Sequence, residues 1–135
     1  MGKSNVLVVE DDDSIRQLLV EYLREHEHVR VDAARDGVEA LHRLTVEGYA
    51  VMVLDVMMPK MSGVDLLHSV QTMASDPSLK ALDEPPPVVV ITATPTAVLP
   101  SETLQSRFPG LVHAVFRKPL EMAALGECVA SLLRR

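Results

Sequence analysis

The sequence predicts an α/β protein in which a parallel β-sheet carries helices on both faces. Three observations lead to this prediction. Apolar runs of strand length recur along the 135 residues, segments with helical spacing separate them, and glycine or proline marks several of the junctions. Unbroken apolar runs are typical of strands buried on both faces, and parallel neighbours need a crossover connection that is usually a helix. The alternation therefore indicates a doubly wound sheet.

Five segments are expected to be strands, at residues 6–9, 29–33, 51–55, 88–91 and 111–116. Most of them are continuous apolar runs, which predicts burial on both faces. In the second, Val29, Val31 and Ala33 alternate with polar residues, which is typical of an edge or half-buried strand. The third segment ends, at its carboxyl end, in a carboxylate residue, Asp55.

Helical spacing of apolar residues predicts a helix after each strand. The first begins near Ser14 and the second after Asp36-Gly37. The third follows Gly63, the fourth is confined by prolines to about 101–108, and the last covers about 120–133. The apolar positions expected to face the sheet are Ile15, Leu18, Leu19, Tyr22, Leu23, Val38, Leu41, Leu44, Val64, Leu67, Val70, Leu125, Val129 and Leu132.

Composition narrows the possible functions. The net charge of −6 and the lack of a basic stripe argue against DNA or RNA binding. No apolar run is long enough to span a membrane, and the N-terminus has no signal peptide, so a cytoplasmic location is expected. Cys128, the only cysteine, excludes an internal disulfide and a cysteine-rich zinc site. We expect residues 1–135 to form a single domain, in which no output domain is visible; the chain could be a stand-alone protein or part of a longer one.

Polar side chains follow several of the expected strands. Because the carboxyl ends of parallel strands lie on one edge of a sheet, these side chains should meet there. They are Glu10, Asp11, Asp12, Asp55, Thr92 and Lys118. Two unit charges about 4 Å apart repel by roughly 4 kcal/mol at an effective dielectric of 20, so clustered carboxylates need a cation.

The residue types at this edge suggest phosphoryl chemistry. Oxygen ligands without a nearby histidine or cysteine favour Mg²⁺. Lys118 adds a positive charge and Thr92 a hydroxyl donor, and both can bind phosphoryl oxygens. Asp55 would be the nucleophile, because an aspartate with the reference pKa of about 3.9 is ionised at neutral pH without a base. Each residue alone has a simpler explanation as a helix cap, a strand residue or a surface charge.

In combination, these residues resemble a known family. The sequence is similar to the receiver domain of two-component response regulators, of the chemotaxis-regulator type. The resemblance rests on Glu10-Asp11, Asp55 with Pro59 and Gly63 at its spacing, Thr92-Ala93 and Lys118-Pro119. It covers residues 6–133 and implies a flavodoxin-like fold with five helices and the strand order 2-1-3-4-5.

The resemblance also implies roles. Asp55 would accept a phosphoryl group from a phosphohistidine on a histidine kinase or phosphotransfer protein. Thr92 and Lys118 would bind the phosphoryl oxygens, Lys118-Pro119 would be a cis peptide, and the output would be contact with a downstream protein. Magnesium would be held by Glu10, Asp11, Asp55 and the backbone carbonyl of Met57. Asp12 is expected to be a capping or charge residue instead of a ligand.

One position departs from the family pattern. An aromatic residue three positions before the lysine takes part in switching in the family, and here that position is Val115. Phe116 lies one residue later and should point to the opposite face. A pseudo-receiver that binds partners without phosphorylation is therefore an alternative function. An aspartyl-phosphate phosphatase is a weaker one, because such enzymes place a second aspartate where this chain has Met57.

Overall fold

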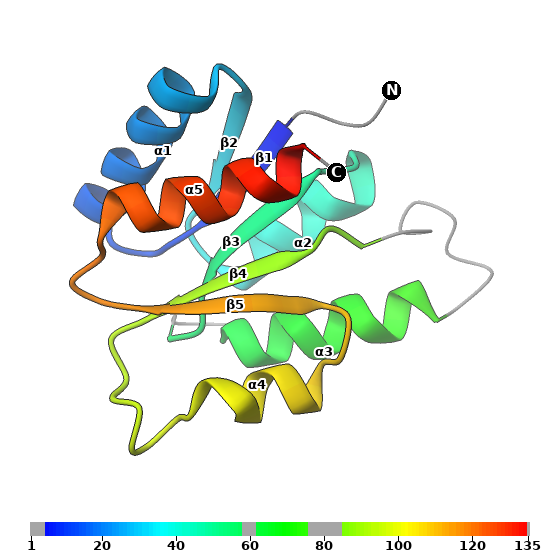
Figure 1. Ribbon diagram of the computed structural model, residues 1–135. Coiled ribbons are helices and arrows are strands. Elements are labelled where there is room, and N and C mark those ends of the chain that lie inside the picture. The colour runs from blue at the N-terminus through cyan, green and yellow to red at the C-terminus, as the bar shows by residue number, and fades with distance from the viewer. Residues whose placement is uncertain (1–4, 58–61, 76–84, 135) are drawn as a thin grey trace.

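The computed structural model describes residues 5–57, 62–75 and 85–134. Its strands form one parallel sheet in the order β2-β1-β3-β4-β5, as expected (Figure 1). The strands are β1 (Asn5–Val9), β2 (Arg30–Ala34), β3 (Val51–Asp55), β4 (Val88–Thr92) and β5 (Val112–Arg117). β2 lies at one edge, which agrees with its alternating sequence pattern.

Helices cover both faces of this sheet (Figure 1). They are α1 (Asp13–Glu27), α2 (Gly37–Val46), α3 (Gly63–Ala74), α4 (Ser101–Arg107) and α5 (Met122–Leu133). α1 and α5 pack on one face, and α2, α3 and α4 pack on the other. None of these helices is long and apolar enough to cross a membrane.

The core consists of two layers, one on each face of the sheet. In β1, Leu7 and Val9 point to the layer under α2, α3 and α4, whereas Val6 and Val8 point to the layer under α1 and α5. This is the two-residue period of a strand. All five residues of β3 and of β4 are buried, which explains why each strand is apolar up to its last residue, Asp55 or Thr92.

Two apolar residues predicted to face the sheet are exposed. Leu18 is 53% exposed and Val38 is 55% exposed. Two residues turn a helix by about 200°, so Leu18 lies almost opposite buried Val20, and Val38 lies almost opposite buried Ala40. The apolar stripes in the sequence are therefore wider than the surfaces that the sheet covers.

The ends of several elements differ slightly from the expected ranges. β5 begins and ends one residue later than predicted, and α5 begins at Met122 because Glu121 has extended backbone at the N-cap. α4 is as short as the flanking prolines predicted. Most of the expected surface connection at 75–87 lies outside the described residues.

Candidate phosphoacceptor site

Three carboxylates meet at the carboxyl edge of the sheet. Glu10 directly follows β1, Asp55 ends the neighbouring strand β3, and Asp11 lies in the loop before α1. One oxygen of each lies within 4.8 Å of the others. Glu10 is fully buried and Asp55 is 2% exposed, whereas Asp11 is exposed. The predicted acidic cluster is thus formed, partly inside the protein.

Backbone amides hold the two buried carboxylates. The N–H of Met57 donates to Asp55 Oδ1 at 3.0 Å, and the N–H of Asp12 donates to Glu10 Oε2 at 3.1 Å. The Asp12 side chain accepts a hydrogen bond from the N–H of Ile15 and caps α1, as predicted. Asp12 therefore helps to organise the loop without joining the cluster of potential ligands.

Lys118 connects the two buried carboxylates. Its Nζ lies 2.7 Å from Glu10 Oε1 and 3.3 Å from Asp55 Oδ2. Its backbone N–H donates to the carbonyl of Thr92 at 2.8 Å, and the peptide bond to Pro119 is cis, as expected. One ammonium therefore spans the ends of β1 and β3, although Lys118 follows the edge strand β5.

Thr92 ends β4 and is fully buried. Its Oγ1 accepts a hydrogen bond from the N–H of Thr94 at 3.0 Å. A hydroxyl that accepts one bond keeps its own hydrogen for another acceptor. The residue is thus at the predicted edge, in the strand beside β3.

The electrostatics of this cluster favour binding of a further cation. Burial raises the pKa of Glu10, and the nearby Asp55 adds to the rise, although Lys118 opposes it. Burial and the Glu10 carboxylate raise the pKa of Asp11. Burial lowers the pKa of Lys118, but its contacts with Glu10 and Asp55 outweigh burial and raise it. The raised carboxyl pKa values mean that one ammonium does not fully compensate these acids.

This donor set fits magnesium. It consists of carboxylate oxygens within reach of one another, with no histidine or cysteine among the described residues of the cluster. Met57 is described and exposed, but its expected carbonyl role stays a prediction. Pro59, part of the sequence motif, lies outside the described residues.

Gly63, the other residue of that motif, has a clear packing role. Its N–H donates to the carbonyl of Val56 at 3.1 Å. A Cβ at this position would lie 2.4 Å from Val56 Cα and 2.7 Å from the Asp55 carbonyl oxygen. Only glycine allows α3 to start this close to the end of β3.

Val115 and Phe116 point to opposite faces of the sheet, as predicted. Val115 packs against the layer under α2, α3 and α4 and is half-buried. Phe116 packs against the layer under α1 and α5. No aromatic side chain therefore occupies the position that the family uses for switching.

Two arginines near the site were not predicted. Arg16 Nη1 donates to the carbonyl of Glu10 at 3.0 Å, and its guanidinium pairs with Asp13, so it braces the acidic loop. Arg117 donates to the segment that follows Thr92. The spacing of Asp13 and Arg16 is a weak sequence signal for the first. Nothing in the sequence indicated the second, because its acceptors are mainly backbone carbonyls.

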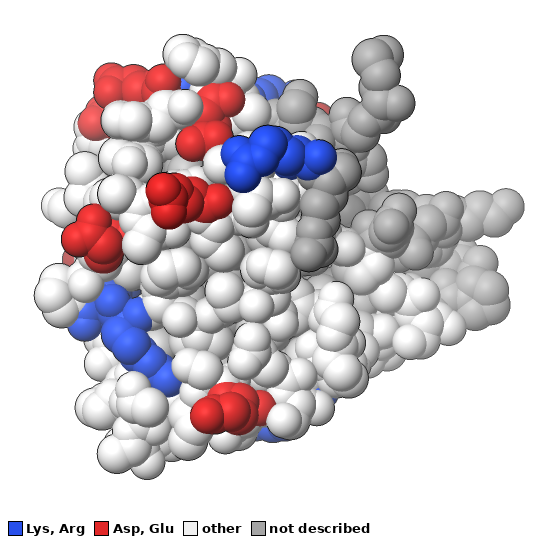
Figure 2. All heavy atoms as spheres, in the orientation of Figure 1, with Lys and Arg blue, Asp and Glu red and all other residues white. Residues whose placement is uncertain are grey.

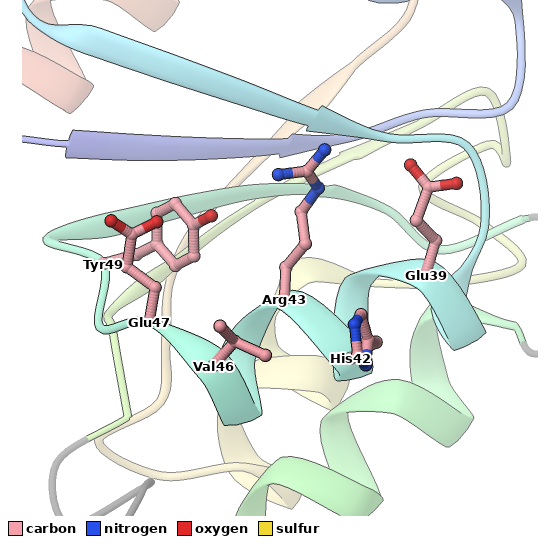
Figure 3. Close-up of a pocket in the computed structure, with 6 residues that line it drawn as sticks. All are labelled: Glu39, His42, Arg43, Val46, Glu47 and Tyr49. Atoms are coloured by element: carbon pink, nitrogen blue, oxygen red, sulfur yellow. The ribbon is translucent and has the colours of Figure 1, made fainter.

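A separate hollow of about 300 Å³ lies beside α2 (Figure 3). It is lined by Glu39, His42, Arg43, Val46, Glu47 and Tyr49. The Tyr49 hydroxyl donates to Asp32 Oδ2 at 2.7 Å, and burial together with this contact raises the pKa of Tyr49 to about 12. None of the predicted site residues lines this hollow. We therefore interpret it as part of a polar cluster that supports the edge strand β2.

Surface charge agrees with the acidic composition. On the face shown in Figure 2, lysine and arginine form small separate groups between acidic groups and uncharged surface. The described residues on this face therefore form no continuous basic stripe of the kind that contacts nucleic-acid phosphates.

Curated proteins with similar sequences are bacterial regulators. The transcriptional regulatory protein CpxR homolog of Haemophilus influenzae is 39% identical over 74 residues, which cover 55% of this chain and 32% of that protein. The regulatory protein VanRB of Enterococcus faecalis is 31% identical over 130 residues, or 96% of this chain and 52% of that protein. The chain thus spans about half of VanRB and a third of the CpxR homolog.

Solved structures and the family comparison agree. The Francisella response regulator 1452 receiver domain has a TM-score of 0.77 and 26% identity, with 98% of each chain covered. Chemotaxis protein CheY4 of Vibrio cholerae, at 24% identity and a TM-score of 0.77, shows the same fold over 97% of this chain and 99% of its own. Residues 6–129 match the response regulator receiver domain family. The chain therefore belongs to the family of response regulator receiver domains.

Proposed function

We propose that this domain accepts a phosphoryl group on Asp55 from a phosphohistidine of a histidine kinase or phosphotransfer protein. The observation that supports it most directly is the position of Lys118, whose ammonium contacts both Asp55 and Glu10 while Asp11 completes the cluster. A nucleophilic carboxylate is thereby surrounded by groups that can receive phosphoryl oxygens.

In the proposed step, an Asp55 oxygen attacks phosphorus and forms an O–P bond. The N–P bond of the phosphohistidine breaks, and its electron pair stays on the imidazole nitrogen, which takes a proton. Lys118 is 3.3 Å from Asp55 and would bind a phosphoryl oxygen. Thr92 would donate its hydroxyl hydrogen to another, because its oxygen already accepts from Thr94.

Glu10, Asp11, Asp55 and the backbone carbonyl of Met57 would hold magnesium. When bound, the ion supplies positive charge that offsets the carboxylates and the developing charge on the phosphoryl group. The Met57 N–H already orients Asp55 Oδ1, and the Asp12 N–H orients Glu10 Oε2. These amides fix the carboxylates in place before any partner arrives.

The domain would thus catalyse its own phosphorylation and dephosphorylation and is not a classical enzyme. We propose that it acts in the cytoplasm, where kinases form phosphohistidine from ATP, and that its output is contact with a downstream protein. A pseudo-receiver that binds partners without phosphorylation is the alternative, and Val115 at the switch position is the observation that favours it.

Intact-mass spectrometry after incubation with acetyl phosphate tests the proposal. The unsubstituted protein should gain one phosphoryl group only when Mg²⁺ is present. Asp55→Asn should gain none, and Asp11→Asn should gain far less. Glu25→Gln is the control for the loss of one negative charge, because Glu25 is exposed on α1 and lies outside the cluster. If rapid quenching traps no adduct on the unsubstituted protein, the pseudo-receiver is the better description.

A further inference from the structure

Arg117, at the end of β5, holds the segment that connects β4 to α4. Its Nη1 donates to the Thr94 carbonyl at 2.8 Å, and its Nη2 donates to the Leu99 carbonyl at 2.6 Å and to Ser101 Oγ at 3.3 Å. Among the described residues it forms no ion pair with a carboxylate. One side chain thus binds Thr94 at the start of the segment, Leu99 near its end and Ser101 at the first position of α4.

This segment has few other attachments. Ala93 and residues 95–98 are exposed, and only Leu99 packs, in part, against the core. Its own hydrogen bonds are local, from the N–H groups of Val98 and Leu99 to the Pro95 carbonyl, each at 3.0 Å. Exposed backbone with little apolar burial is the part of a fold that opens most easily. The Arg117 contacts are therefore the main connection between the segment and the sheet.

The same contacts reach the acceptor site through Thr92. The Lys118 N–H donates to the Thr92 carbonyl, and the Thr94 N–H donates to the Thr92 hydroxyl. The Thr94 carbonyl in turn accepts from Arg117. Consecutive residues, Arg117 and Lys118, therefore hold residues 92–94 from two sides, and the Lys118 ammonium contacts Asp55.

We propose that Arg117 is a positioning residue that keeps residues 94–101 closed on β5 and links them to the acceptor site. The closed segment is a property of the fold itself, whereas its response to phosphorylation rests on the proposed function. When Lys118 and Thr92 bind a phosphoryl group, Thr94 moves with them. The contacts of Arg117 with Thr94, Leu99 and Ser101 then transmit this movement to α4. An aliphatic Val115, packed in the core, has no ring that could do this.

Hydrogen exchange of the intact protein without a phosphodonor tests the first part. In Arg117→Met, the amides of Thr94, Val98 and Leu99 should exchange about tenfold faster, because their segment opens more often when several hydrogen bonds are lost. Arg117→Lys should restore part of the protection, since an ammonium can still reach one carbonyl. Arg35→Met is the control, because Arg35 is exposed, pairs with Glu39 at 3.7 Å and lies beside α2 at the edge of the sheet away from residues 94–101.

Amides of β1 and β3 provide the internal standard. If they exchange at the same rate in Arg117→Met, the faster exchange at 94–101 is local and not caused by global destabilisation. Unchanged protection at 94–101, or an equal effect of Arg35→Met, would overturn the positioning role.

Acetyl phosphate with Mg²⁺ tests the second part. Phosphorylation of the unsubstituted protein should change exchange at 94–101, and Arg117→Met should be phosphorylated without a further change there. A change of full size in the variant would show that another route links the site to α4. If the unsubstituted protein takes no phosphoryl group, the proposed function fails together with this link, and the donor-free comparison still decides whether Arg117 holds the segment.

Discussion

Among the described residues, Glu10 has the most deeply buried charged side chain. Its carboxylate is fully buried between a backbone amide and the Lys118 ammonium. Removal from water is the main reason why its pKa is raised, and Asp55 nearby adds to the effect. Such a residue lowers the stability of the protein at neutral pH unless a cation compensates it. The proposed acceptor site would therefore trade stability for a place where a cation can bind.

Asp11→Asn tests this trade-off. In the absence of divalent cations, the variant should unfold at a higher urea concentration than the unsubstituted protein, because one of the mutually repelling carboxylates is gone. Magnesium at a hundred times its dissociation constant should stabilise the unsubstituted protein by about 2.7 kcal/mol. It should stabilise the variant much less. Glu25→Gln is the control for the change in net charge, because Glu25 is exposed on α1.

The pH dependence follows from the same pKa shifts. Glu10 and Asp11 have raised pKa values, so the folded protein binds their protons more tightly than the unfolded chain. Without metal, the free energy of unfolding should therefore fall as the pH rises from the ordinary pKa values of these acids through their raised values in the folded protein. Magnesium must displace these protons. Its apparent affinity, measured by calorimetric titration, should therefore weaken on acidification, beginning above the ordinary glutamate pKa of 4.5. Constant affinity down to that pH would contradict the assigned ligands.

The sequence predicted the acceptor residues but not the arginines around them. Glu10, Asp55 and Thr92 lie at or just after strand ends, and the parallel topology alone brings such positions together. Arg117 could not be found in this way. Its partners are mainly backbone carbonyls of a connecting segment, and a sequence pattern carries no information about where such a segment folds.

Element packing depends on two glycines with different surroundings. A Cβ on Gly63 would meet backbone atoms of Asp55 and Val56, whereas a Cβ on Gly126 in α5 would meet the Tyr22 ring of α1, Cε1 at 2.8 Å. Backbone cannot yield without moving the end of β3, but a ring at a helix surface can turn. The two positions therefore differ in how well they tolerate alanine.

Gly63→Ala should destabilise the protein by about 1–3 kcal/mol, as overpacked positions typically do. It should also slow phosphorylation, because the displaced backbone carries Asp55. Gly126→Ala is the matched variant and should be nearly neutral, since the gain in helix propensity of about 1 kcal/mol offsets the movement of Tyr22. Chemical denaturation and the mass assay measure both variants. Equal losses of stability and of phosphorylation rate in the two variants would show that contact with the backbone of β3 is not the cause of the effect of Gly63→Ala.

Element boundaries and faces were predicted less well than element types. Leu18 and Val38 continue the apolar pattern of their helices, yet both are exposed, because a helix on a sheet buries only the stripe that faces it. Sequence spacing gives the direction of that stripe but not its width, which depends on how closely the neighbouring helix approaches.

At the scale of the whole molecule, the net negative charge predicts that this chain does not bind DNA specifically. Similar proteins are named transcriptional regulators, but this chain covers only a third to a half of them and has a net charge of −6. We expect no specific DNA binding by the chain itself, and nonspecific binding weaker than the roughly 10⁻⁴ M limit typical of DNA-binding proteins. Fluorescence anisotropy with a random duplex at physiological salt measures this. Binding in the micromolar range would show a basic surface outside the face in Figure 2.

The architecture as a whole was predictable because the same local pattern, a strand followed by a helix, repeats along the chain. Alternating strands and helices require parallel pairing and right-handed crossovers, and they place every strand end on one edge. The strand order came only from the resemblance to receivers, because local patterns do not say which strands become neighbours. The order matters for the site, since it puts β1 beside β3 and so brings Glu10 next to Asp55.

The ion pair between Lys118 and Glu10 has a consequence for synthesis on the ribosome. The chain emerges from its N-terminus, so all three carboxylates of the cluster are made well before Lys118. A nascent chain that already pairs β1 with β3 brings these acids together without the ammonium that later connects them. Until β5 has left the ribosome, magnesium in the surrounding solution is the available cation, and early folding of this domain should therefore depend on magnesium more strongly than the stability of the finished protein does.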